Sequence, residues 1–215
     1  MYVALSTAVV DHARAAGLGK IYASVIDHVA VAPDRFREAL AETGWVPDGD
    51  RLEMRRPPAA LGEAPGVERI DPFEPGVTAV VARAMSDSLD DYDQGQVALL
   101  GAERAAEIYR EHMVDPNRPL PWLGHRAADG SLDGIAAVQH YQGGWNLGYL
   151  GVDPSARRRG IGSALVSALL NLAHEYGVDH VSASVNVVND RIRGTLDKHG
   201  FEVFSLRTDH RHDLG

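Results

Sequence analysis

The spacing of apolar and polar positions predicts two similar helix–strand–helix–strand runs, one near each end of the chain. In each run the first helix is expected to end at a glycine, Gly17 or Gly177, because glycine tolerates the left-handed conformation that ends many helices. A β-favouring run follows at 21–25 or 181–185. A second helix then ends at Gly44 or Gly200, and a short strand comes last.

The region between these runs adds further elements. A short strand is expected at 67–70, helices at about 76–87 and 101–113, and apolar strands at 132–140 and 145–152. Gln142-Gly143-Gly144, between the last two strands, is a hairpin signal. From residue 67 onward the expected order is β, α, α, β, β, β, α, β, α, β. This alternation predicts an α/β (α+β) protein whose mixed sheet is packed by helices on both faces.

The two runs also match residue by residue. Residues 4–25 and 164–185 are identical at eight of 22 positions, where composition alone predicts roughly two. After a four-residue shift the match resumes, and each copy ends with a glycine and an aromatic residue, Gly44-Trp45 and Gly200-Phe201. We therefore infer a partial internal duplication.

A stretch with three prolines and two glycines separates the copies at 57–66. We expect a partial segment at 1–56, a linker at 57–66 and a complete domain at 67–215. The partial segment would leave an apolar edge uncovered, so it is expected to dock within the chain or to form a homodimer.

Composition narrows the functional classes. Thirty acidic residues against 21 Lys and Arg give a net charge of −9, which argues against a nucleic-acid partner. The chain has no cysteine, so it has no disulfide, no thiolate nucleophile and no cysteine-ligated metal. No run of eighteen apolar residues provides a membrane span, and the opening segment lacks the basic start of a signal peptide. We expect a cytoplasmic protein.

The most informative stretch leads from the strand at 145–152 into an amphipathic helix. Glycines at 160 and 162 leave room beside the free N–H groups of the helix start, and Arg157, Arg158 and Arg159 add positive charge. We call residues 157–163 the anion cradle. A pyrophosphate suits it, because it accepts several backbone hydrogen bonds while guanidinium groups neutralise it.

The spacing of the cradle does not fit the dinucleotide or P-loop fingerprints, because Leu165 stands where the third glycine is needed and no Gly-Lys-Ser/Thr occurs. Arg157-x-x-Gly160-x-Gly162, after a strand ending in Val-Asp-Pro, instead resembles the GNAT superfamily of acyl-CoA N-acyltransferases. Asn189, followed eleven and twelve residues later by Gly200-Phe201, resembles the later motif of that family. The resemblance covers 67–215 and implies a mostly antiparallel sheet with a splayed parallel pair.

The resemblance also implies a set of functional residues. Backbone groups of Leu150, Gly151 and Val152 would meet the pantetheine arm and the acyl carbonyl of acetyl-CoA. The pyrophosphate would be held by Arg157, Arg158, Arg159, Gly160, Ile161, Gly162 and Ser163, and the pantetheine arm by Asn189. An amine would attack the thioester directly, without a metal and without a covalent enzyme intermediate.

One position departs from the family. Many members place a tyrosine seven residues after the asparagine, as general acid toward the departing thiolate, and this chain has Leu196 there. Either another group protonates the thiolate, or the thiolate leaves unassisted with a pKa near about 8.5, or the domain is a weak or inactive catalyst.

Other candidates for the chemistry are less specific. Tyr149 is the catalytic candidate, and Trp145 and His140 are its alternatives for lining the acceptor pocket; each also fits packing or a surface position. The acidic run 87–93 would attract a cationic amine or would form a solvated loop. His210 and His212 share one strand face, which we expect to be solvated because a third metal ligand is missing.

The sequence thus predicts an enzyme, an acetyl-CoA-dependent N-acyltransferase that uses an amine acceptor of unknown identity. The alternative is a non-catalytic CoA-binding or interaction module that has lost its general acid, as Leu196 and the half-copy would allow.

Overall fold

The computed structural model describes residues 1–28, 30, 32–141 and 143–215, so Gln142 of the expected hairpin turn lies outside the described residues. Within them the chain forms seven α-helices, eight strands and one 3-10 helix. In chain order these are α1 (Tyr2–Ala15), β1 (Lys20–Ile26), α2 (Pro33–Glu42), β2 (Val46–Arg56), β3 (Val67–Ile70), α3 (Val77–Met85), α4 (Asp91–Leu100), α5 (Ala102–Met113), β4 (Trp122–Arg126), β5 (Leu132–Tyr141), β6 (Gly144–Val152), η1 (Pro154–Ala156), α6 (Ile161–Glu175), β7 (Val181–Asn186), α7 (Asp190–Lys198) and β8 (Glu202–Asp213). The order expected from residue 67 is confirmed, with α4 as an additional helix.

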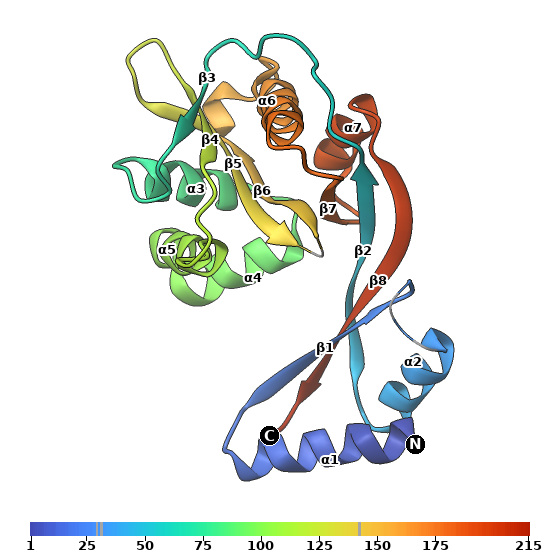
Figure 1. The fold of residues 1–215 in the computed structure, drawn as a ribbon. Coiled ribbons are helices and arrows are strands. Elements are labelled where there is room, and N and C mark those ends of the chain that lie inside the picture. The colour runs from blue at the N-terminus through green and yellow to red at the C-terminus, as the bar shows by residue number, and fades with distance from the viewer. Residues whose placement is uncertain (29, 31, 142) are drawn as a thin grey trace. The chain divides into compact units, whose positions relative to one another are not determined.

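The strands are ordered β1-β8-β2-β7-β6-β5-β4-β3 (Figure 1). The pairs β1–β8, β3–β4, β4–β5 and β5–β6 are antiparallel, and β6–β7 is parallel. The predicted mixed, mostly antiparallel sheet with one parallel pair is therefore confirmed. A parallel pair needs a long crossover, and here α6 provides it between β6 and β7.

The chain divides into two compact units. Unit 1 comprises Met1–Glu53 and Val203–Gly215, and unit 2 comprises Met54–Glu202. These bounds differ from the expected segments in two places, because 203–215 group with unit 1 and the last three residues of β2 group with unit 2. The division into a half-domain at 1–56 and a complete domain at 67–215 stays a prediction.

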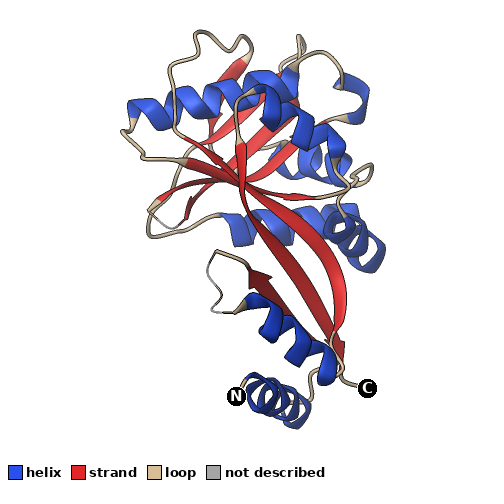
Figure 2. Cartoon of the chain, turned by 90° about the vertical axis from the view of Figure 1, so that its right-hand side faces the viewer, coloured by secondary structure: helices blue, strands red, loops and turns tan. Residues whose placement is uncertain are grey.

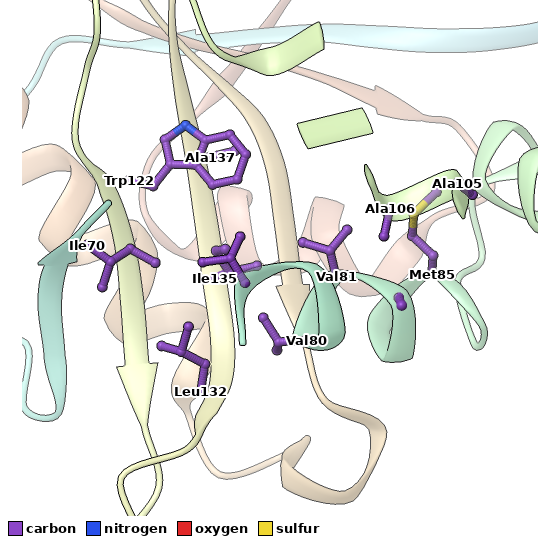
Figure 3. Close-up of a cluster of buried hydrophobic side chains, with 12 residues drawn as sticks. Ile70, Val80, Val81, Met85, Ala105, Ala106, Trp122, Leu132, Ile135 and Ala137 are labelled. Atoms are coloured by element: carbon purple, nitrogen blue, oxygen red, sulfur yellow. The ribbon is translucent and has the colours of Figure 1, made fainter. Parts of the chain in front are cut away.

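One face of the unit 2 sheet holds the main core (Figure 3). Its described members come from β3, α3, α5, β4 and β5: Ile70, Val77, Val80, Val81, Ala82, Met85, Ala105, Ala106, Trp122, Leu132, Ile135 and Ala137. Figure 3 shows Val80 and Val81 of α3 beside Ile135 of β5. Burial of these side chains fixes α3 and α5 on this face.

The opposite face of the unit 2 sheet carries α6. A Cβ at Gly134 would lie 2.5 Å from Ile161 Cγ2 and 3.1 Å from Leu165 Cδ1. Because neighbouring strand residues point to opposite faces, Gly134 faces away from Ile135 and its core. The glycine therefore lets the first turn of α6 approach β5 closely, and Figure 2 shows helices on both sides of these strands.

Unit 1 has a small core of its own. Its buried members are Val10, Val25, Leu40 and Trp45. The Trp45 indole N–H donates to Ser6 Oγ (2.8 Å), and Ser6 Oγ lies 2.6 Å from Thr43 Oγ1. Leu5 and Val9 on α1 remain 57% and 46% exposed, so this helix presents an apolar face to solvent.

The element order supports the inferred duplication. Each copy runs helix, strand, helix, strand, as α1-β1-α2-β2 and as α6-β7-α7-β8. The matched residues are also buried alike, since Leu40 and Leu196 are 1% and 0% exposed and Trp45 and Phe201 are 5% and 4% exposed. The repeated residues thus have the same packing role in each copy.

The two histidines on β8 are buried, and the expected solvated strand face is wrong. His210 Nδ1 lies 3.2 Å from the Thr208 carbonyl, and both ring nitrogens of His212 lie within hydrogen-bond distance of carbonyl oxygens. Burial also lowers the pKa of His210. A nitrogen that donates to a carbonyl has no lone pair for a metal. Across the part of the chain that the structure describes, no group of three His, Cys, Asp or Glu is arranged to hold a metal ion.

The end of β2 provides a test of the unit boundary. Met54 is 0% exposed, so Met54→Ala is expected to lower the free energy of unfolding by about 2–4 kcal/mol through the cavity it leaves. The control is Val46→Ala at the exposed start of the same strand, which should change it by less than about 0.5 kcal/mol. Urea unfolding followed by tryptophan fluorescence measures both. Equal, small effects would show that the end of β2 is not part of a core.

Candidate active site

The parallel strands β6 and β7 separate after a short contact. Their pairing in the described residues covers two positions, Trp145 with Val181 and Asn146 with Ser182. Beyond these, β6 continues through 147–152 and β7 through 183–186 without pairing to each other in the described residues. Strand backbone groups need partners, so this divergence leaves one side of β6 open to a ligand's amide or carbonyl groups.

A β-bulge lies in β6 where the separation begins. The register against β5 passes from Val138–Leu147 to Ala137–Tyr149 and leaves Gly148 without an opposite residue. The Tyr109 hydroxyl donates to the Gly148 carbonyl (2.9 Å). A Cβ at Gly148 would lie 2.8 Å from Met113 Sδ, so any larger residue would require the Met113 side chain to move. Bulges of this kind redirect the strand and are frequent at active sites.

Tyr149, the catalytic candidate, follows the bulge directly. Its ring centroid lies 5.2 Å from that of Tyr109. Burial, assisted by the negative charge of Asp93 in the first turn of α4, raises the pKa of the Tyr149 phenol well above its usual value. The phenol therefore stays protonated at neutral pH. A phenol that stays protonated does not act as a general base, and the raised pKa also makes it a weaker acid.

The next residues of β6 are those expected to face the acyl donor. Leu150 and Val152 are half-buried and Gly151 is buried. A Cβ at Gly151 would lie 2.5 Å from Tyr149 Cε1 and 3.0 Å from Ala84 Cβ, so this glycine allows the Tyr149 ring to fold back along the strand. The roles of Leu150, Gly151 and Val152 in binding a cofactor stay predictions.

The anion cradle has the backbone geometry of an open helix start. Arg158 and Gly160 have positive φ, +64° and +85°. Ala164 N–H donates to the Gly160 carbonyl (2.9 Å), and no side chain caps α6. The N–H groups of Ile161, Gly162 and Ser163 thus precede the helical hydrogen bonds and carry the positive end of the helix dipole. This arrangement fits an anionic group such as a phosphate.

The three arginines of the cradle differ in their surroundings. The Arg157 side chain turns inward: its guanidinium donates to the carbonyls of Val152 (3.1 Å) and Ala84 (3.4 Å) and pairs with Asp87. Arg158 and Arg159 are exposed. The Arg157 side chain therefore joins the end of β6 to the end of α3, and the charge available to a phosphate comes from Arg158 and Arg159.

Asp153 fixes the turn between β6 and the cradle. Its carboxylate accepts hydrogen bonds from the Ser155 hydroxyl (2.6 Å) and from Arg83, which together lower its pKa to about 2. A carboxyl whose pKa falls on folding stabilises the native state above its unfolded pKa, here 3.8. That contribution is lost as the pH falls through about 2.

Asn189, expected to meet the pantetheine arm, is the N-cap of α7. Its Oδ1 accepts from the Ile192 N–H (3.3 Å), and the residue is 7% exposed. Leu196, at the position of the family's tyrosine, is 0% exposed. The leucine is therefore a core residue, and the chain has no hydroxyl at this point of α7.

Each acidic residue of the run 87–93 has a role within the fold. Asp87 pairs with Arg157, Asp90 caps α4 by accepting from the Tyr92 N–H, and Asp91 accepts from Asn186 Nδ2 on β7 (3.2 Å). Asp93 is buried beside Tyr149. The solvated-loop interpretation is wrong for Asp93, since α4 brings it close to β6.

Trp145 lies near the start of β6, where this strand still pairs with β7, and His140 lies opposite it on β5. Trp145 is buried, and its ring packs on Tyr176 with centroids 5.2 Å apart. His140 lines two cavities of about 110 and 390 Å³ together with Arg118. The predicted cofactor-binding residues line neither cavity. Trp145 and His140 therefore lie away from the cradle.

Comparisons with known proteins identify the family of this chain and agree with its fold. The model of the acetyltransferase (GNAT) family matches residues 84–201. Since this is more than half of the chain, the chain belongs to that family. Tyr149, the bulge, the cradle and Asn189 all lie inside the matched range.

Individual relatives are more distant. A mycothiol acetyltransferase of Beutenbergia cavernae is 36% identical over 92 residues, which are 42% of this chain and 30% of the relative. The chain thus spans less than a third of that protein. No helix in the described part of the chain is long and apolar enough to cross a membrane.

Solved structures share the fold. A tandem GNAT protein from the clavulanic acid biosynthesis pathway has a TM-score of 0.68 at 18% identity, covering 99% of this chain and 69% of its own. A GCN5-related N-acetyltransferase from Sphaerobacter thermophilus has a TM-score of 0.59 at 19% identity, covering 94% and 64%. The PaiA N-acetyltransferase from Thermoplasma acidophilum, solved with coenzyme A, has a TM-score of 0.50 at 14% identity, covering 66% and 96%.

The different roles of the arginines can be separated experimentally. Arg157→Ala is expected to lower the free energy of unfolding by about 1–3 kcal/mol, because it leaves buried carbonyls without a donor. Arg158→Ala and Arg159→Ala should change stability by less than about 0.5 kcal/mol and weaken CoA binding about 3–10-fold each. Urea unfolding and titration calorimetry provide the two measurements. A fully stable Arg157→Ala protein would contradict the assigned role.

Proposed function

We propose that the chain is an acetyl-CoA-dependent N-acyltransferase that transfers an acetyl group to a primary amine by direct attack in a ternary complex. The observation that carries this proposal is the combination of the opened β6–β7 pair with the uncapped start of α6 directly downstream. Membership of the GNAT acetyltransferase family supports the same assignment. In this proposal Leu150, Gly151, Val152 and Asn189 contact the pantetheine side, and residues 157–163 hold the pyrophosphate.

The reaction needs little from the protein beyond orientation and hydrogen bonds. The neutral amine attacks the thioester carbonyl, its nitrogen loses a proton to bulk water, and the carbon–sulfur bond breaks to release the thiolate of CoA, which then takes up a proton. Backbone N–H groups of β6 near the bulge stabilise the oxyanion that forms during the attack. The chain contains no cysteine, which agrees with a transfer that forms no thioester on the protein.

Tyr149 is the group we assign as proton donor to the departing thiolate. It is the catalytic candidate whose phenol is held protonated, and it lies beside the bulge on β6. Its role compensates for Leu196 on α7, where many family members place a tyrosine. A general acid of this kind contributes about 10²–10⁴-fold in rate.

The acceptor amine is not identified. Asp93 adds negative charge near Tyr149, which favours a cationic amine that loses its proton before attack. Because a mycothiol acetyltransferase is among the relatives, the acceptor of that enzyme belongs in any panel of amines. Cytoplasmic location and self-association through the partial copy stay predictions.

A second function is supported by one observation. Leu196 is completely buried where the family's general acid stands, which is what a CoA-binding module without catalysis would show. The two functions differ in turnover, since both bind CoA and only the enzyme releases its thiol.

The assay that tests the proposal measures thiol release from acetyl-CoA with a panel of amines, alongside CoA binding by calorimetry. Gly162→Val is expected to weaken CoA binding about tenfold or more, because a branched side chain stands beside the free N–H groups of α6. Gly95→Val in α4, where a Cβ meets nothing within 4 Å, is the control and should bind normally. Binding without thiol release for any amine would favour the module, and unchanged binding by Gly162→Val would contradict the cradle.

If Tyr149 is the proton donor, loss of its hydroxyl should lower kcat and leave KM for acetyl-CoA nearly unchanged. Tyr149→Phe keeps the ring and removes the hydroxyl, so kcat should fall about 10²–10⁴-fold while KM for acetyl-CoA changes by less than about threefold. Steady-state kinetics with the best amine of the panel measures this. Wild-type kcat in Tyr149→Phe would exclude the phenol as donor.

A further inference from the structure

Two neighbouring cavities lie at the end of the β5–β6 hairpin. The smaller, of about 110 Å³, is lined by β5 and by the segment that follows α5, and the larger, of about 390 Å³, is lined by the hairpin and by the segment that joins α6 to β7. The larger volume is in the range of small-molecule sites. Arg118 and His140 line both cavities, so these two side chains stand where the cavities meet.

The Arg118 guanidinium carries a charge that no carboxylate in the described part of the chain neutralises. Its Nη2 donates to His140 Nδ1 (3.4 Å). A guanidinium cannot accept, so Nδ1 of the neutral imidazole holds the lone pair and Nε2 holds the hydrogen. The other N–H groups of the guanidinium and this Nε2–H are therefore donors for a ligand.

Each cavity also has one carboxylate in its lining. Asp115 of the smaller cavity accepts from the Asn117 N–H of its own turn (2.9 Å). Asp179 is exposed and lines the larger cavity alone. Neither carboxylate forms an ion pair with the Arg118 guanidinium, so the charge common to both cavities is positive. It favours an anionic group of a ligand at this point.

Two side chains separate the smaller cavity from the β-bulge at Gly148. Met113 and Gln139 line the cavity, and a Cβ at Gly148 would lie 2.8 Å from Met113 Sδ and 2.9 Å from Gln139 Oε1. Methionine is a flexible side chain that adapts to what packs against it. A ligand in the cavity therefore has a short path to the part of β6 where the thioester is proposed to bind.

We propose that Arg118 and His140 bind an anionic group of the acceptor, so that the acceptor is a primary amine that also carries a carboxylate. The inference rests on the proposed function, because it places the amine at the bulge. His140 pairs with Trp145, which lies three residues before Gly148. Strand residues rise about 3.3 Å each, which puts the anionic group about 10 Å from the amine. An ω-amino acid has this form.

The charges at the two ends of the path agree with such an acceptor. Asp93 adds negative charge near Tyr149, where the amine end would arrive as a cation, and Arg118 adds positive charge at the other end. None of the predicted cofactor-binding residues lines either cavity. The cofactor and the anionic group of the acceptor therefore do not compete for the same residues, as a ternary complex requires.

A purely structural role of Arg118, as a contact that orders the segment after α5, predicts a different result. It would change KM for every amine alike, whereas recognition of an anionic group acts only on acceptors that carry one. An ω-amino acid and its primary amide have the same amine and the same length, and they differ in charge at the far end. The ratio of their kcat/KM values therefore isolates the proposed contact.

The experiment measures thiol release from acetyl-CoA with a homologous series of ω-amino acids and their amides, and the binding of the acids by calorimetry. At the best chain length, wild type should use the acid about tenfold better than the amide in kcat/KM. Arg118→Ala should raise KM for the acid about tenfold with kcat nearly unchanged, and should change KM for the amide by less than about twofold. His140→Phe should raise KM for the acid about threefold. Arg118→Glu should reverse the preference, so that an α,ω-diamine of the same length becomes a better acceptor than the acid.

Arg104→Ala is the matched control, because Arg104 is an exposed arginine of α5 that pairs with Glu107, and it should behave like wild type. Equal kcat/KM values for acid and amide in wild type, equal losses for both in Arg118→Ala, or an unchanged preference in Arg118→Glu would overturn the proposal and leave the proposed function standing. If no amine gives thiol release, the proposed function fails and calorimetry decides on the site. Binding of the acid that is lost in Arg118→Ala then supports the site, and binding that is absent or unaffected overturns it.

Discussion

The site depends on a shortage of backbone hydrogen bonds. β6 and β7 start as a regular parallel pair but bond over only two positions in the described residues, and strands in a folded protein rarely leave such groups unpaired without a ligand or water. The bulge at Gly148 explains how the strand leaves its partner, because one additional residue in β6 bends it while β5 continues. The Tyr109 hydroxyl donates a hydrogen bond to the Gly148 carbonyl, which the bulge exposes.

The cradle follows from the same geometry. Once β6 has diverged, the chain must reverse into α6 within a few residues, and the positive φ values of Arg158 and Gly160 mark that reversal. Arg157 and Asp153 fix both sides of the turn through the carbonyl of Val152 and the side chain of Arg83. The turn that carries the cradle is therefore fixed by residues that bind the protein itself. Arg158 and Arg159 are exposed beside it, and Arg159 also donates to the Ser155 carbonyl (3.3 Å).

The sequence predicts the elements from residue 67 well, because apolar periodicity and glycine positions are local properties. It predicts the location of the cradle for the same reason. It does not distinguish Arg157 from Arg158, because three adjacent arginines carry the same charge and only the backbone turn decides which one points inward. Tyr109 was missed because it reaches β6 from α5, and no local pattern records that contact. Asp93 belongs to the acidic run that the sequence singles out, but its burial beside Tyr149 depends on how α4 packs. His210 and His212 were misjudged because a strand at residues 202–213 that packs on Trp45 has no exposed face at those positions.

The position of Leu196 shows how a catalytic group can be relocated. A buried leucine on α7 is the residue that a packed core favours, and Leu40 at the matched position of the first run is buried in the same way. The matched position thus holds a core side chain in both runs. In the proposed reaction the proton for the thiolate comes from another element, and Tyr149 beside the opened strand is the group we assign. Burial and the charge of Asp93 raise the pKa of this phenol, so the acidic helix α4 acts on the electrostatics of β6.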